Sequence, residues 1–102
     1  MVFDLSEVTG IGDYLTKTEK NSDASKARTL FYKGDKVFLV QNKHTVELRT
    51  DRELAKLLKD KYESVMDSRY FGRGGIEIVL AGNQLSSSEI ADLVRLSYNL
   101  TK

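Results

Sequence analysis

Apolar and polar residues alternate along the middle of the chain, as they do in β-strands that are buried on one face. Strands are predicted at residues 28–33, 36–41 and 44–50. The letters KGDK at 33–36 indicate a tight turn, and NK at 42–43 fits a short hairpin connection. Strands joined by such short turns run antiparallel. In the third strand the two faces differ, with Val46 and Leu48 on one and Thr45, Glu47 and Arg49 on the other.

Near the N-terminus the apolar residues have the spacing of a helix rather than a strand. Leu5, Val8, Ile11 and Leu15 recur at helical intervals. Gly10 weakens the pattern, because a glycine inside a helix costs about 1 kcal/mol relative to alanine. We therefore expect an N-terminal helix that is broken near this glycine.

Two later helices begin at pairs with capping-box spacing, Thr50 with Glu53 and Ser86 with Glu89. The first helix is predicted over residues 51–63, and its buried face consists of Leu54, Leu57, Leu58 and Tyr62. The buried face of the second consists of Ile90, Leu93, Val94, Ser97 and Tyr98. Between the helices, strands are predicted at residues 65–71 and 76–80.

The predicted elements define a fold class. Their order is α-β-β-β-α-β-β-α, in a chain of 102 residues that has room for one core. We expect an α+β two-layer sandwich in which helices cover one face of a five-stranded antiparallel sheet. The whole chain, residues 1–102, is predicted to be a single domain.

The second face of this sheet is predicted to be mixed. Because side chains alternate along a strand, two of the four apolar residues at 37–40 must point away from the helices, as must one of Phe31 and Tyr32. Glu47 and Glu77 are expected on that face as well. Such a face is either a partner surface or the covered side of an inner strand, and the sequence leaves both interpretations open.

Composition excludes several classes of protein. The 16 basic and 15 acidic residues nearly cancel, so the total charge does not indicate a nucleic-acid or membrane partner. Without cysteine there is no disulfide and no thiolate metal site. The N-terminal letters MVFDLSEVTG do not resemble a secretory signal, and no apolar run approaches the ~20 residues of a spanning helix. We expect a cytoplasmic domain without a membrane partner.

Candidate catalytic and metal-binding residues are few. His44 is the single histidine, and its place beside Lys43 at the start of a strand predicts an exposed turn residue. The serines at 86–88 are explained by helix capping, and no strand–turn–helix serine motif is present. No pair of carboxylates stands out in the sequence. We therefore predict no catalytic residue, no metal site and no cofactor, and a protein that is not an enzyme.

Three glycines and an arginine follow an aromatic pair in the stretch YFGRGG at residues 70–75. A phosphate-binding loop of the Rossmann type would open a helix, whereas this stretch precedes the strand-like letters IEIVL. A single RGG tripeptide is also poor evidence of an RNA-binding segment. The preferred interpretation is structural: Gly72, Gly74 and Gly75 form a turn that needs positive φ and joins two antiparallel strands.

Basic residues concentrate in the first half of the chain. Between residues 26 and 43 a single acid, Asp35, accompanies five basic residues: Lys26, Arg28, Lys33, Lys36 and Lys43. With aromatic residues at 31 and 32 between them, they form a candidate nucleic-acid-binding set that would contact the phosphate backbone. The alternative is that these lysines keep a strand edge soluble.

The end of the chain resembles a known family. The letters YFGRGGIEIVL at 70–80, and the ending of Leu93, Ser97, Tyr98 and Leu100, resemble the end of the YjbR/MmcQ-like family. The hairpin KGDKVFLVQNKHTVELRT resembles another segment of that family. The family usually has tryptophan where Ile76 stands, and residues 1–27 do not match it. A small archaeal relative would fit the same pattern.

The resemblance implies a fold shared in outline with the TfoX N-terminal domain and the secretion chaperones. The family is uncharacterised, carries a predicted DNA-binding label and offers no catalytic residues to transfer. Two functions are therefore expected to compete. One is a weak nucleic-acid-binding module that uses the basic hairpins; the other is a protein-interaction or homodimerising adaptor domain that uses the open sheet face.

Overall fold

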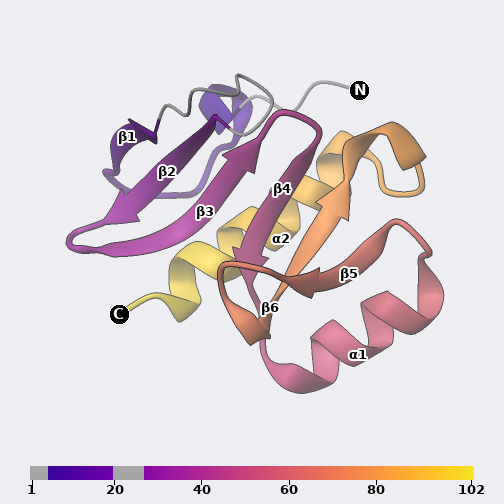
Figure 1. The fold of residues 1–102 in the computed structure, drawn as a ribbon. Helices are drawn as coiled ribbons and strands as arrows, with labels where there is room; N and C mark the ends of the chain where they lie inside the picture. The colour runs from indigo at the N-terminus through magenta and orange to yellow at the C-terminus, as the bar shows by residue number, and fades with distance from the viewer. Residues whose placement is uncertain (1–4, 20–26) are drawn as a thin grey trace.

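The computed structural model describes residues 5–19 and 27–102, and these form one sheet with two helices against one of its faces (Figure 1). The described strands are β1 (Leu15–Glu19), β2 (Arg28–Lys33), β3 (Lys36–Asn42), β4 (Thr45–Arg49), β5 (Val65–Ser68) and β6 (Gly72–Val79). The helices are α1 (Arg52–Lys61) and α2 (Ser87–Leu100), with short 3-10 turns η1 (Leu5–Glu7) and η3 (Leu80–Gly82). The predicted α+β class with an antiparallel sheet is confirmed.

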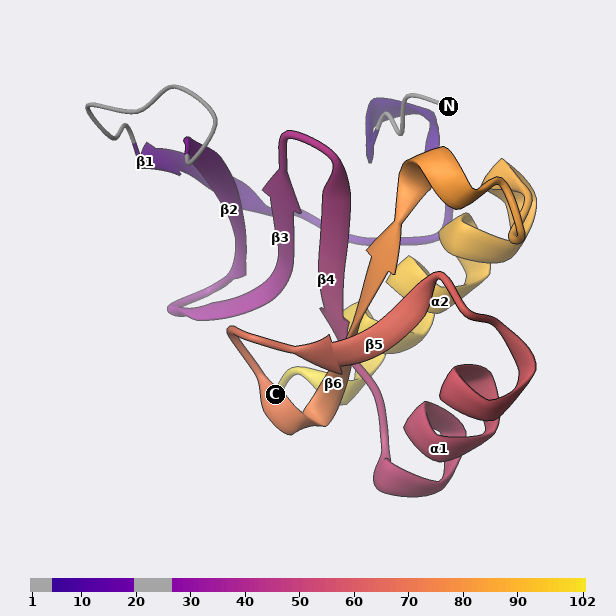
Figure 2. The same cartoon turned by 45° about the vertical axis from the view of Figure 1, so that its right-hand side comes forward.

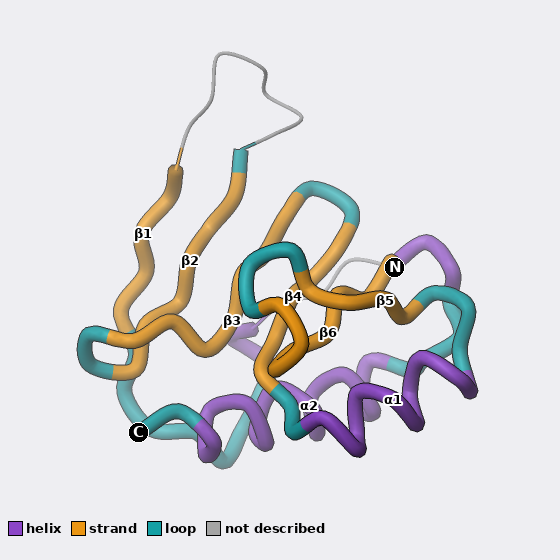
Figure 3. Tube along the Cα trace, turned by 60° about the horizontal axis from the view of Figure 1, so that its bottom comes forward, coloured by secondary structure: helices purple, strands orange, loops and turns teal. Residues whose placement is uncertain are grey.

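Two layers result from this arrangement. Both helices lie on the same side of the sheet, below it in the view of Figure 3. Among the described strands the sheet has six members in the order β1-β2-β3-β4-β6-β5, and every neighbouring pair is antiparallel. The prediction of five strands is therefore wrong. The chain leaves β4 through α1, forms the edge strand β5, and returns as β6 between β5 and β4 (Figure 2).

The sixth strand is β1, which begins at Leu15, the last apolar residue of the predicted N-terminal helix. Only the 3-10 turn η1 is helical among the described residues before β1. Gly10 has a φ of 80°, which ends any helix there, and the backbone on both sides of it is hydrogen-bonded to α2. The Arg95 side chain donates to the carbonyl oxygen of Thr9 at 2.5 Å, and the Tyr98 hydroxyl donates to that of Asp13 at 2.9 Å. These tertiary contacts override the helical spacing of the apolar residues.

The two long helices begin differently from each other. At α2 the predicted capping box is confirmed, since Ser86 Oγ accepts from the Glu89 N–H and Glu89 Oε1 accepts from the Ser86 N–H, both at 3.1 Å. At α1 the predicted cap is wrong. Asp51, not Thr50, caps the helix by accepting from the Leu54 N–H at 2.7 Å. No helix within the described residues is long and apolar enough to cross a membrane.

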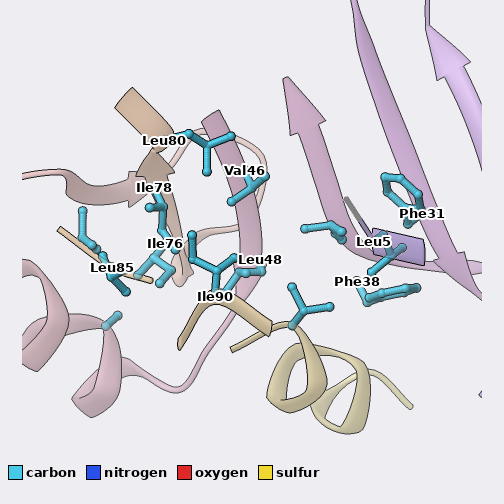
Figure 4. Packing of buried hydrophobic residues seen from close by; sticks show 14 residues of the cluster. Leu5, Phe31, Phe38, Val46, Leu48, Ile76, Ile78, Leu80, Leu85 and Ile90 are labelled. Atoms are coloured by element: carbon cyan, nitrogen blue, oxygen red, sulfur yellow. The ribbon is translucent and has the colours of Figure 1, made fainter. Parts of the chain in front are cut away.

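The main core lies between the sheet and the helices (Figure 4). From the sheet it contains Val46, Leu48, Ile76 and Ile78, and from α2 it contains Ile90 and Val94. On α1 the predicted apolar face is shifted: Leu57 is exposed, and Ala55 is buried instead. We call the sheet face toward the helices the inner face, and the opposite one the outer face.

A β-bulge decides which apolar residues of β3 reach the inner face. Leu39 pairs with Phe31 and Val37 pairs with Tyr32, so Phe38 is an extra residue without a partner on β2. Phe38 and Leu39 therefore both point into the main core, whereas Val37 and Val40 belong to a separate cluster on the outer face. Two of the four residues do point away from the helices, as predicted, and so does Tyr32.

Ser97 fastens α2 to the middle of the sheet. Its side chain is fully buried, and its hydroxyl donates to the Phe38 carbonyl oxygen at 2.5 Å while accepting from the Arg49 N–H at 2.7 Å. A polar side chain thus bridges two backbone groups that lie one residue beyond the last β3–β4 pair, Leu39 with Leu48. The position of the helix against β3 and β4 is fixed by these bonds.

Candidate nucleic-acid interface

The outer face of the sheet is partly covered by the connection between β5 and β6. Leu30, Val37 and Val40 form a buried cluster on this face, against which Tyr32 and Phe71 pack. Phe71 comes from the β5–β6 connection, which folds back over the sheet. Of the two interpretations of the mixed face, the covered one is correct for this apolar part.

The glycines of this connection do not all have the predicted role. Gly72 has a φ of 65° and makes the turn, but Gly74 and Gly75 lie within β6 and do not have positive φ. Gly75 is needed for space instead. A Cβ at this position would lie 2.6 Å from the Leu48 carbonyl oxygen and 2.6 Å from the Phe71 Cβ. The glycine therefore lets the Phe71 side chain lie directly on the sheet.

Two glutamates stand side by side beneath this connection. Glu47 on β4 pairs directly with Glu77 on β6, and their exposed fractions are 1% and 2%. The sequence did not reveal the pair, because β4 and β6 are separated by a helix and a strand and no hairpin links them. The available signal was that both glutamates occupy polar positions in strands whose apolar and polar residues alternate, which predicts that both point away from the helices.

Glu47 holds the β5–β6 connection in place. One carboxylate oxygen accepts from the Ser68 hydroxyl and from the Tyr70 N–H, each at 2.9 Å, and the other accepts from the Asn42 amide at 2.8 Å. Burial by itself would raise the pKa of Glu47, but these hydrogen bonds and the nearby Arg69 charge outweigh it and hold the pKa below its ordinary value. Glu47 is therefore an ionised anchor at neutral pH.

Glu77 is paired with a charged partner. Its two oxygens accept from Arg69 at 3.0 Å (Nε) and 2.8 Å (Nη2), and one of them also accepts from the Thr45 hydroxyl at 2.7 Å. The hydrogen bonds and charge of Glu77 raise the pKa of Arg69. Each oxygen of the two glutamates has a donor, so the pair forms a hydrogen-bonded network that ties β4 and β6 to the β5–β6 connection.

Arginines lie over the aromatic rings that cover this face. The Arg28 guanidinium is 5.4 Å from the centre of the Tyr70 ring, and that of Arg49 is 4.8 Å from the centre of the Phe71 ring. Such contacts combine cation–π attraction with a flat, weakly hydrated cation. We call this surface the arginine–aromatic face; its residues are Arg28, Tyr32, Arg49, Arg69, Tyr70 and Phe71.

Arg28 is the one predicted site residue on the arginine–aromatic face. Its Nε donates to Glu19 of β1 at 2.8 Å, and the side chains of the two residues are 36% and 41% exposed. An ion pair this open to water contributes only about 0.2–1 kcal/mol. A phosphate group can therefore compete with Glu19 for the guanidinium.

The predicted lysines are spread over the molecule instead of forming one patch. Lys33 and Lys36 pair with each other at the β2–β3 turn, five residues or more along the strands from Arg28 and Asn42. Lys33 is already engaged: its ammonium donates to the Tyr98 carbonyl oxygen at 3.0 Å and lies 4.5 Å from the centre of the Tyr98 ring. Lys26 lies outside the described residues.

Lys43 lies at the other end of the hairpin, beside an open hollow of about 330 Å³. The hollow is lined by Thr18, Ala27, Arg28, Thr29, Gln41, Asn42 and Lys43. Alternation places Thr29 and Gln41 on the inner face, whereas Arg28 and its pairing partner Asn42 lie on the outer face. The hollow therefore takes in both faces at this end of the sheet, and it brings together Arg28 and Lys43, two of the predicted site residues.

The remaining expectations concern histidine and metals. His44 is exposed in the β3–β4 turn, as predicted. Among the described residues there is no group of three or more histidines and acids that could hold a metal ion.

Comparison of the chain with protein-family models, with curated proteins and with solved structures finds no match. The resemblance to the YjbR/MmcQ-like family therefore stays a prediction from the sequence.

Proposed function

We propose that this chain is a non-catalytic nucleic-acid-binding module and that its arginine–aromatic face makes the contact. The observation that carries the proposal is the pairing of Arg28 with the half-exposed ring of Tyr70. Guanidinium groups bind phosphate oxygens, and aromatic rings bind bases, so the pair offers both kinds of contact at one place. The predicted DNA-binding label of the YjbR/MmcQ-like family agrees with this function.

The charge balance implies that binding is local and weak. The net charge of the chain is +1, so no long-range field attracts a polyanion. Affinity must come from a few contacts made by exposed guanidinium groups. Arg69 is 75% exposed although it pairs with Glu77, so its remaining N–H donors are open to a phosphate.

The proposal is tested by removing the acid that competes for Arg28. Glu19→Gln should strengthen binding of a short oligonucleotide, because the guanidinium no longer has a carboxylate partner. The matched control is Asp67→Asn, which removes the same charge from another surface ion pair, that of Lys59 on α1. Fluorescence anisotropy titrations of the wild type and both variants, at two salt concentrations, measure the effect.

We expect a several-fold gain in affinity for Glu19→Gln and a smaller gain for Asp67→Asn. Arg28→Ala should weaken binding and reduce the dependence of log affinity on log salt by roughly 0.7–0.9, the value of one phosphate contact. Equal gains for both neutralising variants would mean that only net charge matters. Absence of binding to any nucleic acid at low salt would rule out the proposed function.

A homodimer or adaptor is the second candidate, and one observation favours it. Strand β1 is an edge strand, and four of its five residues are exposed, including Leu15 at 68%. Its outer edge offers unpaired backbone groups for another strand. Solution mass decides this candidate: a dimer that resists salt, and is disrupted by Thr16→Pro, would support it, whereas a monomer at all concentrations would exclude the homodimer.

A further inference from the structure

We propose that the nucleic acid taken by this face is single-stranded and that one base stacks on the Tyr70–Arg28 pair. The inference rests on the proposed function and adds the class of ligand. It depends on the exposure of the Tyr70 ring, on the way the ring is held, and on the shape of the surface around it.

The Tyr70 ring is exposed although nearby groups hold it in place. Tyr70 as a whole residue is 40% exposed, while its backbone N–H donates to the buried Glu47 at 2.9 Å. The Phe71 ring packs against it at 5.0 Å with an interplanar angle of 77°, and the Arg28 guanidinium lies 5.4 Å from its centre. A base therefore meets a ring whose position is already set, so that little conformational entropy is lost on binding.

The carboxylate network below explains why the ring stays outside the core. Glu47 fixes the backbone at Tyr70, and Glu77 fixes the neighbouring Arg69. Phe71 packs against the apolar cluster of the outer face. The connection thus covers this cluster with one aromatic residue and leaves the preceding one, Tyr70, exposed beside Arg28 and Arg69.

Single strands suit this geometry better than duplexes. In a duplex the faces of the bases are stacked on each other, and a protein reads the edges by placing an element in a groove. Tyr70 lies in the connection that folds over the sheet and is 40% exposed, so an unstacked base can reach it. Arg28 lies against the ring, and the exposed Arg69 is the next residue along the chain, so both can contact the phosphates that flank such a base.

The test compares one mixed-sequence strand with the duplex formed from it, using fluorescence anisotropy and the variants Tyr70→Ala and Tyr70→Phe. We expect the wild type to bind the single strand more tightly. Tyr70→Ala should weaken single-strand binding by roughly tenfold, which is within the usual effect of losing one stacking contact, without changing the salt dependence. Tyr70→Phe should keep the affinity. Leu57→Ala, which removes an exposed apolar side chain from α1, is the control and should have no effect.

Two outcomes separate the inference from the proposed function. If the wild type binds strand and duplex equally and Tyr70→Ala changes neither, the single-strand inference fails while nucleic-acid binding stands. If the wild type binds neither form at low salt, both fail.

A measurement on the wild type keeps the inference testable if Tyr70→Ala does not fold. On addition of the single strand, the ring proton resonances of Tyr70 should move upfield, as expected for a ring that stacks on a base. Resonances that move equally with the duplex, or that do not move at saturation, would overturn the inference.

Discussion

At the scale of single residues, Glu47 connects the core to the candidate site. It is buried at the centre of the outer face, yet its carboxylate remains ionised because three donors surround it. Burying a charge away from water is costly unless hydrogen bonds replace the lost hydration. Two of those three bonds come from the segment that carries Tyr70, so the same interactions satisfy the charge and hold the backbone of that segment.

The pKa of Glu47 predicts how stability depends on pH. Because the folded-state pKa lies below the ordinary value of 4.5, the unfolded chain binds a proton more readily than the folded one. The contribution of Glu47 to the free energy of unfolding is therefore complete above pH 4.5 and is lost as the pH falls through the folded-state value. Urea unfolding at a series of pH values measures this effect.

The control for this prediction is Glu47→Gln, which keeps the shape of the side chain but does not titrate. Its free energy of unfolding should be lower than that of the wild type at neutral pH and should fall less steeply in acid. Parallel profiles for the two proteins would contradict the assignment of Glu47 as an ionised anchor.

At the scale of elements, the β5–β6 hairpin does most to shape the outer face. Its turn needs one glycine with positive φ, Gly72, and its return strand needs another glycine for space, Gly75. The hairpin then folds Phe71 onto the sheet. The stretch YFGRGG thus covers part of the outer face of the sheet.

This role predicts different effects for two neighbouring glycines. Gly75→Ala should destabilise the protein by about 1–3 kcal/mol, because the new methyl group would press on the Leu48 carbonyl and on Phe71. Gly74→Ala should change stability by less than about 0.5 kcal/mol, since the nearest atom to a Cβ there, the Phe71 carbonyl oxygen, would be 3.9 Å away. Thermal unfolding followed by circular dichroism compares them, and equal effects would contradict the role of Gly75.

The elements that were predicted correctly have strong local signals. The strands of the β2–β3–β4 meander follow from alternation and short turns, and α2 follows from its capping box and apolar face. The N-terminal strand was missed because it is formed by pairing with β2 and by contacts to α2, which lie far away in the sequence. The start of α1 was misplaced by one residue because Thr50 and Asp51 are both residues that cap helices.

The candidate site was predictable only in part. Arg28 was identified from the cluster of basic residues, but the partners that define the site come from β4 and from the β5–β6 connection. Their approach depends on β6 inserting between β4 and β5, which no local pattern in the sequence specifies. The lysines of the β2–β3 turn carried most of the sequence-based hypothesis, yet the Lys33 ammonium contacts Tyr98 of α2 instead of the outer face.

At the scale of the whole molecule, the two faces of the sheet have different roles. The inner face and the helices bury the main core, as Figure 4 shows, and supply the stability of the domain. The outer face carries a smaller apolar cluster, a buried carboxylate pair and the arginine–aromatic face above it. A chain with nearly balanced charge thus gathers arginine and aromatic side chains on one face, and this is the surface that we propose for nucleic acid.

The most direct test of the role proposed for the outer face is to map the binding surface. The amide chemical shifts of the isotope-labelled protein are followed during titration with a short single-stranded oligonucleotide. The largest changes in chemical shift should fall on the outer face, at Arg28, Arg69 and Tyr70. The amide chemical shifts of α1 and α2 should not change. Changes confined to the helices or to the turn at Lys33 and Lys36, or no changes at all, would contradict the assignment of the arginine–aromatic face.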